Sequence, residues 1–393
     1  MNAPVLAMTR SWIPRTEALA RLGVKPQTLY AYVSRGRISA RPDPDNPRCS
    51  LYAAEDVARL LDRSARPQPR PLASPGGAFR GEAVMDSAIT TVTEAGLFFR
   101  GRDAVRLADS ATLEQVCRVL WLGDDDPFAD LKPRVDVIFP GGPRARAFAS
   151  LARRAEEDAV SAGRSDRSLR REAAAVLNEL VDSVAGGGPR LYLHQRLARA
   201  WKINEADAAV LRRALVLSAD QPLDAATLAV RVTAQTGASV AACALAGWAA
   251  LSGPRAGGRL AQVSAFVSEA SRGSDARMAA RARLAQGLDL PGFGHPDFPQ
   301  GDPRARALLA AARLPEALLD IVRVGEGLTG EAPNFDLALA LVARQLDLPR
   351  DAAFTLNAVG RTAGWAAHVL EQGASGSPIR ARLRYVGPEP DPA

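Results

Sequence analysis

The sequence has little cysteine and histidine, and it has no long apolar run. The 393 residues include three cysteines, Cys49, Cys117 and Cys243, whose wide separation matches neither a disulfide framework nor a zinc-binding motif. We therefore expect packed thiols and no bound metal. No apolar stretch reaches the roughly 18 residues that a transmembrane helix needs, so no membrane partner is predicted. The first residues lack the basic and apolar regions of a signal peptide, so we expect a cytoplasmic protein.

The positive charge of the chain is concentrated near its beginning. The formal net charge is +7, and residues 1–70 hold eleven Arg and one Lys against six acidic residues. The remaining residues are therefore nearly neutral. Any partner that the positive charge attracts is expected to bind the N-terminal part.

Changes in amino-acid composition along the chain predict three parts: residues 1–65, a linker at 66–80, and a large domain at 81–393. The linker contains RPQPRPLASPGG (66–77), which is rich in Pro and Gly. The large domain repeatedly places apolar residues three or four positions apart, as in ATLEQVCRVLWLG and FDLALALVARQL. This spacing is typical of helices, and TVTEAGLFFRG (91–101) is the best candidate for β structure, so a mainly α fold is predicted.

Residues 1–65 predict a small module of two helices, a hairpin and a closing helix. A helix over 16–22 is predicted to end at Gly23, and Pro26 is predicted to begin a helix over 26–34. GRISARPDPDNPRCSLY then favours a β hairpin, and AAEDVARLL a closing helix. This order resembles the winged helix-turn-helix module of the MerR and excisionase type.

The resemblance to that module implies DNA as a partner and assigns contacts to individual residues. Side chains of the second helix would read bases in the major groove, and arginines of the hairpin region would contact phosphates. The implied base-reading residues are Lys25, Gln27, Thr28 and Tyr30, and the implied phosphate-binding residues are Arg37, Arg41 and Arg48. Such modules also serve for packing or dimerisation, so both interpretations stay open. One copy makes few phosphate contacts, and useful affinity would need a dimer.

Five ordered segments of the large domain carry a second resemblance. They are GLFFRGRDAVRLADSATLEQVCRVLWLG (96–123), LVLSADQPLDAATLAVRVTAQTGASVAACALAGWAALSGPRAGG (215–258), LPGFGHPDFPQGDPRARALL (290–309), EAPNFDLALAL (331–341), and GRTAGWAAHVLEQ (360–372) with IRARLRYVG (379–387). In this order and spacing they resemble the citrate synthase family, over residues 85–387. The resemblance implies large and small helical domains, with a smaller, mobile subdomain at about 255–360.

The resemblance implies condensation of acetyl-CoA with oxaloacetate to give citrate and free coenzyme A. Asp336 in PNFD would remove a methyl proton, and His295 in GFGH would polarise the ketone. Arg304, Arg361 and Arg380 would bind the substrate carboxylates through their planar forks. The family takes the last of these arginines from the other subunit, which implies a dimer. Coenzyme A is then a substrate, and no separate cofactor is expected.

Two histidines of the family are missing from this chain. The family loop Gly-Pro-x-His-Gly-Gly places a His beside the developing enolate, and here that position is Ala256. The family His that binds the dicarboxylate is here Gln221, whose amide still donates hydrogen bonds. His194 and His368 are not spaced to replace the pair. Loss of one oxyanion donor typically lowers turnover about 10²–10³-fold, so impaired or altered activity is expected.

Three functions therefore stay open at this point. The first is an altered condensing enzyme of the citrate synthase type, which the kept base and arginines favour. The second is a catalytically degenerate subunit that forms a heterodimer with an intact homologue rather than a homodimer. The third is a DNA-binding regulator that senses a di- or tricarboxylate or coenzyme A.

Overall fold

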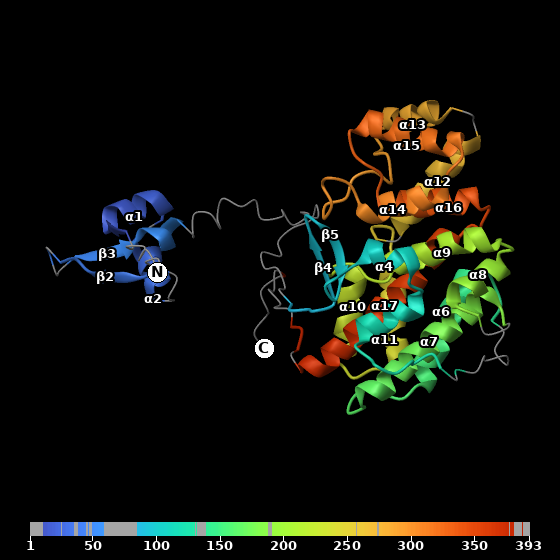
Figure 1. Cartoon of the computed structure of the whole chain (residues 1–393), viewed down its shortest axis with the longest axis horizontal. Helices are drawn as coiled ribbons and strands as arrows, with labels where there is room; N and C mark the ends of the chain where they lie inside the picture. The colour runs from blue at the N-terminus through green and yellow to red at the C-terminus, as the bar shows by residue number, and fades with distance from the viewer. Residues whose placement is uncertain are drawn as a thin grey trace, which may run out of the picture. The chain divides into compact units, whose positions relative to one another are not determined.

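The structure is a computed structural model that describes the chain in two compact units, residues 1–83 and 84–393 (Figure 1). The described residues are 11–24, 26–34, 38–44, 46, 49–58, 85–129, 131, 139–187, 191–256, 258–272, 275–376, 378–380 and 387. The predicted linker at 66–80 lies outside them, as do Lys25, Arg37 and Arg48, and the side chains of Gln27 and Thr28.

The N-terminal unit packs two helices against a small antiparallel sheet. Its elements are β1 (Trp12–Pro14), α1 (Arg15–Leu22), α2 (Pro26–Ser34), β2 (Ala40–Pro42), β3 (Ser50–Ala53) and helical residues 54–58, and the sheet order is β1-β3-β2. Gly23 ends α1 in the left-handed conformation, with φ of 62°. Ile13, Leu29 and Tyr52 lie in its hydrophobic core. The two predicted helices and the predicted hairpin are thus present, whereas recognition of DNA stays a prediction.

The C-terminal unit is mainly helical, which confirms the predicted class. Its sheet, of order β4-β5-β6, consists of β4 (Thr90–Thr93), β5 (Gly96–Phe99) and β6 (Arg102–Asp103), so the predicted strand region forms a hairpin. The helices are α4 (Ala104–Ser110), α5 (Leu113–Trp121), α6 (Pro143–Glu157), α7 (Asp166–Ala185), α8 (Leu193–Ala200), α9 (Glu205–Leu217), α10 (Ala225–Ala234), α11 (Val240–Leu251), α12 (Gly258–Arg272), α13 (Ala276–Ala285), α14 (Pro303–Ala312), α15 (Glu316–Thr329), α16 (Phe335–Gln345) and α17 (Ala352–Ser375).

One absence and one correction concern the described residues. None of their helices is long and apolar enough to cross a membrane. Cys117 and Cys243 are buried as expected, but Cys49 is exposed, so the expectation of a packed thiol was wrong there. Cys49 directly precedes β3, whose first residue, Ser50, is exposed as well, so burial begins only further along the strand.

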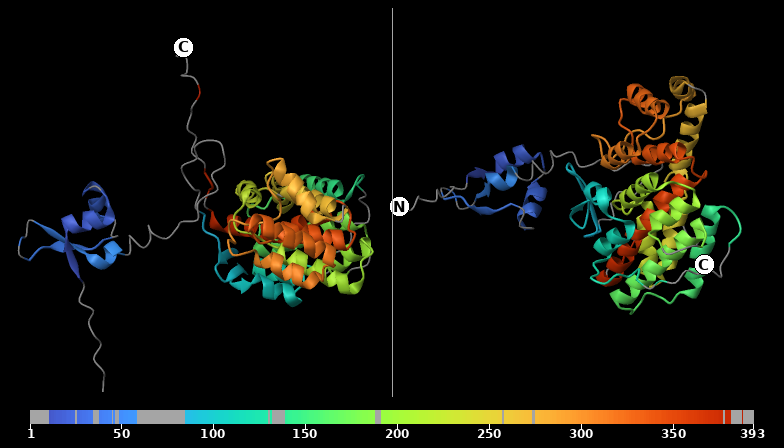
Figure 2. Two further views of the ribbon diagram at one scale, coloured as in Figure 1. Left: turned by 90° about the horizontal axis from the view of Figure 1, so that it is seen from above. Right: turned by 45° about the vertical axis from the view of Figure 1, so that its right-hand side comes forward.

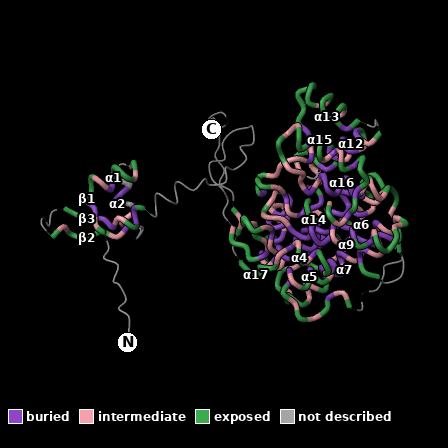
Figure 3. Tube along the Cα trace, turned by 45° about the horizontal axis from the view of Figure 1, so that its top comes forward, coloured by how far each residue is buried: buried purple, intermediate pink, exposed green. Residues whose placement is uncertain are grey.

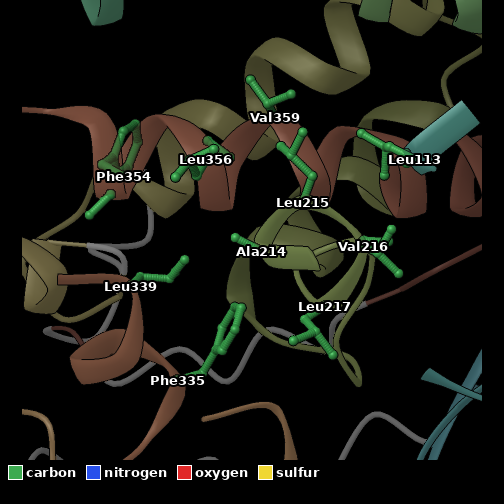
Figure 4. Close-up of a cluster of buried hydrophobic side chains, with 14 of the residues drawn as sticks. Leu113, Ala214, Leu215, Val216, Leu217, Phe335, Leu339, Phe354, Leu356 and Val359 are labelled. Carbon is green, nitrogen blue, oxygen red and sulfur yellow. The ribbon is translucent and has the colours of Figure 1, made fainter. Parts of the chain in front are cut away.

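Helix α17 is the centre of the large unit. It is buried along most of its length and packs against α5, α7, α9, α10 and α11. Figure 4 shows α9 beside it, with Leu215 of α9 close to Val359 of α17, and Phe335 and Leu339 of α16 in the same cluster. Buried positions gather in the interior around α9 and α14, whereas α13 is largely exposed (Figure 3).

Two glycines let α17 approach the segment that follows α9. A Cβ atom added at Gly360 would lie 2.4 Å from the Cβ of Ser218, and one at Gly364 would lie 2.3 Å from Oδ1 of Asp220. The Gly364 N–H donates a hydrogen bond to the Ala219 carbonyl at 2.8 Å. This close approach holds residues 218–220 against the helix and so fixes the start of the ADQP segment.

Helices α12, α13 and α15 lie together at one end of the large unit (Figures 1 and 2). They join the body through α16, which contacts α12 and α17, and through α14, which contacts α16 and α9. The predicted smaller subdomain at about 255–360 includes these helices. Its mobility stays a prediction.

Alanine at Gly360 or Gly364 is expected to destabilise the protein, because each new methyl group would overlap the 218–220 segment. Such overpacking costs about 1–3 kcal/mol of unfolding free energy, or more where backbone must move. Gly373 in the same helix has open space around it, so Gly373→Ala is the matched control and should stabilise by about 0.5–1 kcal/mol. Denaturant unfolding measures the three variants. Equal stability of Gly364→Ala and Gly373→Ala would contradict the close packing.

Candidate active site

Two loops from different parts of the sequence are joined edge to edge beside the start of α16. The Gly294 N–H donates to the Ala332 carbonyl at 2.9 Å, and the Asn334 N–H donates to the Gly292 carbonyl at 2.9 Å. The Asn334 side chain adds a hydrogen bond from Nδ2 to the Gly294 carbonyl at 3.0 Å. These bonds bring the GFGH segment, which ends in His295, against the PNFD segment.

Glycine is required at the first of these positions. Gly292 has φ of 98°, and a Cβ atom there would lie 2.9 Å from the Cβ of Leu337 in α16. Only a residue without a side chain fits this backbone conformation and this close approach. The glycine of the GFGH motif therefore serves the packing of the loop on α16.

Asp336 lies in the first turn of α16, two residues after the N-cap residue Asn334. Desolvation raises the pKa of its carboxyl group to about 6. The positive charge of Arg304 lowers this pKa, and the negative charge of Asp302 raises it further. Among the described residues, no hydrogen bond to this carboxylate is present. A carboxylate with a pKa near neutrality and free oxygens is suited to accept a proton from a substrate.

Arg304 is the second residue of α14, and it is buried near this carboxylate. Its Nε and Nη2 donate to the two oxygens of Asp302 at 3.0 and 2.8 Å. Its guanidinium carbon lies 5.3 Å from the ring centre of Phe298 and 4.9 Å from that of Phe335. Its Nη1 has no hydrogen-bond partner among the described residues. One edge of the guanidinium is thus held by protein, and one nitrogen is available to an anionic ligand.

Asp302 links the arginine to the start of α16. Its Oδ2 also accepts a hydrogen bond from the Phe335 backbone N–H at 3.1 Å, and its Oδ1 caps α14 through the Arg304 N–H at 3.0 Å. The Arg304 charge and these bonds outweigh the effect of burial and lower the pKa of the Asp302 carboxyl group. It therefore stays ionised and fixes the arginine next to Asp336.

His295 is neutral and has a defined proton position. Burial and the nearby Arg304 charge lower its pKa. The Asp297 backbone N–H donates to its Nδ1 at 3.2 Å, so the ring proton is on Nε2. This Nε2–H group lies 3.5 Å from the amide Nε2 of Gln221, which is itself a donor, so the two groups do not hydrogen-bond to each other. The Nε2–H group can therefore donate to a substrate oxygen placed between the loops.

Arg361 is placed differently from the resemblance-based expectation. It is 1% exposed, and its guanidinium is held by protein: Nη1 and Nη2 donate to the two oxygens of Asp224 at 2.8 and 2.9 Å. Nη2 also donates to Thr227 Oγ1 at 2.7 Å, and Nη1 to Gln221 Oε1 at 3.2 Å. Gln221 thus lies between Arg361 and His295. The structure brings Arg361 to the site, but with an internal carboxylate already bound.

The Gly-Pro loop offers no side-chain donor at position 256, where Ala stands. The Ala256 N–H donates to the Gly253 carbonyl at 3.0 Å, so this backbone group is also occupied. Arg259 follows in the first turn of α12, and its positive charge lowers the pKa of both Asp336 and His295. Arg259 was not predicted as a site residue from the sequence. Its place three residues after Ala256, in the helix that follows the loop, could have indicated that its charge lies near the site.

The other predicted site residues lie apart from this cluster. Arg380 is exposed, and the adjacent Ile379 is held by Gln235 through hydrogen bonds of 2.6 and 3.3 Å. His368, which was not predicted as a site residue, lies 3.3 Å from Oδ2 of Asp220 and 3.1 Å from Nη1 of Arg231 in a buried network. Among the described residues, no group of three or more His, Cys, Asp or Glu is placed to hold a metal ion.

Replacing Asp336 with Asn is expected to stabilise the protein at neutral pH. The folded carboxyl pKa of about 6 exceeds the ordinary value of 3.8, so the folded state binds the proton more tightly. The stability that this proton contributes is complete below about pH 4 and is lost as the pH rises through about 6. At pH 8 the variant should therefore gain at most about 3 kcal/mol, and near pH 4 almost nothing.

Urea unfolding across this pH range measures the gain, with Asp320→Asn on the exposed surface of α15 as the matched control. If the free energies of unfolding of Asp336→Asn and Asp320→Asn change with pH in the same way, the raised pKa of the Asp336 carboxyl group is refuted.

Comparison with known proteins gives the fold and the family. The model of the family "Citrate synthase, C-terminal domain" matches residues 145–382. The citrate synthase of Thermotoga maritima has a TM-score of 0.65 at 22% identity, and covers 79% of this chain and 95% of that one. A Thermoplasma acidophilum citrate synthase, solved with carboxymethyl coenzyme A and oxaloacetate, has a TM-score of 0.66 at 21% identity, with the same coverage.

Several relatives are more similar in sequence over a shorter length. "Putative citrate synthase 2" of Mycobacterium tuberculosis is 36% identical over 187 residues, which are 44% of this chain and 50% of the relative. "Citrate synthase 2" of Bacillus subtilis is 33% identical over 45% of this chain and 50% of the relative. The chain thus matches about half the length of these curated relatives. Since the family model covers more than half of the chain and the fold agrees, this protein belongs to the citrate synthase family.

Proposed function

We propose that the protein condenses an acyl-CoA thioester with a 2-oxo acid, in the manner of citrate synthases. The observation that carries the proposal is the Asp336 carboxylate, which is desolvated and free of hydrogen bonds among the described residues. The charge of the paired Arg304 acts both on this carboxylate and on the neutral His295. A base, a proton donor for a ketone and an anion-binding group are the parts that this reaction needs. Relatives named citrate synthase or 2-methylcitrate synthase support the same class.

In the proposed reaction Asp336 takes a proton from the carbon next to the thioester carbonyl. The resulting enolate attacks the ketone carbon of the 2-oxo acid, while the Nε2–H group of His295 donates to the ketone oxygen. Nη1 of Arg304 binds the acid carboxylate. Hydrolysis of the thioester then releases free coenzyme A, which is a substrate rather than a resident cofactor.

The enolate oxygen lacks the histidine donor of the family, since Ala256 has no polar side chain and its N–H is bonded to Gly253. We propose that the Arg259 charge provides part of the missing stabilisation. Arg259 is exposed in the first turn of α12, where water screens its charge. It therefore replaces the hydrogen bond that the family histidine donates to the enolate oxygen only partly. Turnover is therefore expected to be low.

Restoring the two family histidines should raise the turnover. Ala256→His with Gln221→His is expected to increase coenzyme A release about 10²-fold or more, because one oxyanion donor alone contributes about 10²–10³-fold. The assay follows free thiol with acetyl- or propionyl-CoA and a panel of 2-oxo acids. Activity should rise with pH through an apparent pKa near 6, since only ionised Asp336 accepts a proton.

Asp336→Asn in the restored protein is the control, and it should remove the release. Absence of release from both the natural and the restored protein, across all substrates, would falsify the proposal.

The position of Arg380 is relevant to the assembly that we propose. Arg380 is exposed at the end of the described C-terminal segment, and no described contact joins it to His295 or Asp336. An exposed arginine there is free to enter the site of a second subunit. We therefore propose a dimer, either of two copies or with an intact homologue whose site Arg380 completes.

A second candidate function is DNA binding by the N-terminal unit in a regulator that responds to a carboxylate or coenzyme A. It is favoured by the turn at Gly23 between two short helices, by Tyr30 on α2 with 51% exposure, and by exposed Arg41 on β2. The Arg41 guanidinium lies 4.4 Å from the ring centre of Trp12, which holds it at the surface.

Gel-shift titration of the full chain with a random duplex pool tests this candidate. Tyr30→Ala with Arg41→Ala is expected to weaken binding about tenfold, and to reduce the slope of log affinity against log salt by about 1 for each phosphate that is no longer neutralised. Arg277→Ala, on the exposed face of α13, is the matched control for loss of one positive charge. Undetectable binding at low salt rules this candidate out.

A further inference from the structure

The guanidinium of Arg361 is occupied by this chain's own side chains. Asp224 accepts from Nη1 and Nη2 in the two-bonded geometry that an arginine offers to a carboxylate. Thr227 and Gln221 accept the remaining hydrogens on these nitrogens, at 2.7 and 3.2 Å. Little capacity is left at Nη1 and Nη2 for a further anion.

Asp224 lies on the more accessible side of this pair. The Arg361 side chain is 2% exposed, whereas that of Asp224 is 30% exposed. A ligand that approaches from solvent therefore meets the carboxylate of Asp224 before it meets the guanidinium. The ion pair is also firmly charged, since the Arg361 charge and its hydrogen bonds outweigh burial and lower the pKa of Asp224.

The pair is connected to the proposed reaction centre. Gln221 accepts from Arg361 through Oε1, and its amide nitrogen lies 3.5 Å from Nε2 of His295. His295 and Arg304 interact electrostatically on the other side, where Nη1 of Arg304 has no partner among the described residues. The site thus has one side with an available positive charge and one side where the positive charge is neutralised.

We propose that Asp224 takes the place of one substrate carboxylate, so that the acceptor is a 2-oxo acid with a single carboxylate and an uncharged second substituent. This inference rests on the proposed function and narrows its substrate class. Arg304 binds the one carboxylate next to the ketone. A second carboxylate would meet Asp224 and be repelled by it, because like charges at close range disfavour binding.

The substitution Asp224→Asn tests the role of this carboxylate with little change in local structure. Asp224 is also the N-cap residue of α10, where its Oδ1 accepts from the Thr227 N–H at 2.8 Å. Asn caps helices as well as Asp does, so the helix should form in the variant. The variant keeps the shape of the side chain and frees Arg361 from its counter-charge.

Isothermal titration calorimetry is the measurement, because binding is read without any need for turnover. Pyruvate and 2-oxobutyrate are the monocarboxylate probes, and oxaloacetate and 2-oxoglutarate are the dicarboxylate probes. The natural protein should bind a monocarboxylate at least tenfold more tightly than either dicarboxylate. Asp224→Asn should shift this ratio towards dicarboxylates by about 10–100-fold, the range expected for a hydrogen bond to a charged group.

Glu331→Gln is the matched control, since Glu331 is exposed near the same loops and its carboxylate lies close to Gly294 rather than Arg361. It should leave the ratio unchanged. Tighter binding of a dicarboxylate by the natural protein overturns the inference and leaves the proposed function in place. An equal shift in Glu331→Gln and Asp224→Asn also overturns it, since a general charge effect would then explain the result. If neither the natural protein nor Asp224→Asn binds any 2-oxo acid, the proposed function fails together with the inference.

Discussion

The buried carboxylate of Asp302 is the constraint on which the rest of the site depends. It accepts hydrogen bonds from the Arg304 guanidinium, from the Arg304 N–H at the start of α14, and from the Phe335 N–H at the start of α16. One ionised group thereby positions an arginine, begins one helix and fixes the beginning of another. Asp336 follows Phe335 directly, so the proposed base is placed by the same anchor. Arg304 lowers the pKa of Asp336 and Asp302 raises it, so the two charges act in opposite directions. Desolvation is the largest effect, and it raises this pKa to about 6.

Charge is distributed unevenly over this site. Nη1 of Arg304 has no hydrogen-bond partner among the described residues, and His295 is neutral with its proton on Nε2. Near Arg361 the positive charge is cancelled within the chain by Asp224. Ala256 has no polar side chain, and its N–H is bonded to the Gly253 carbonyl. The family scaffold is therefore kept, while the groups that would contact the enolate and one end of a dicarboxylate are changed.

The sequence predicted the parts that are local or ordered along the chain. Periodicity with Gly and Pro at the ends placed α1 and α2, and periodicity in the large domain predicted its mainly helical class. The motif order led to Asp336, His295 and Arg304. Ion pairs across long sequence separations could not be predicted in this way, because no pattern in the chain indicates that Asp224 reaches Arg361. The influence of Arg259 on two groups of the site likewise depends on how α12 packs. Exposed Cys49 shows that residue type alone does not decide burial, since it stands before the exposed first residue of β3.

The central claim is that Asp336 still acts as a base toward a bound acyl-CoA. Exchange of deuterium from methyl-deuterated acetyl-CoA into water, followed by mass spectrometry, measures this step separately from condensation. The account predicts exchange above the buffer rate when a 2-oxo acid is bound, increasing with pH through about 6, and its loss in Asp336→Asn. Exchange equal to that of buffer in the natural protein, or undiminished in Asp336→Asn, would contradict it.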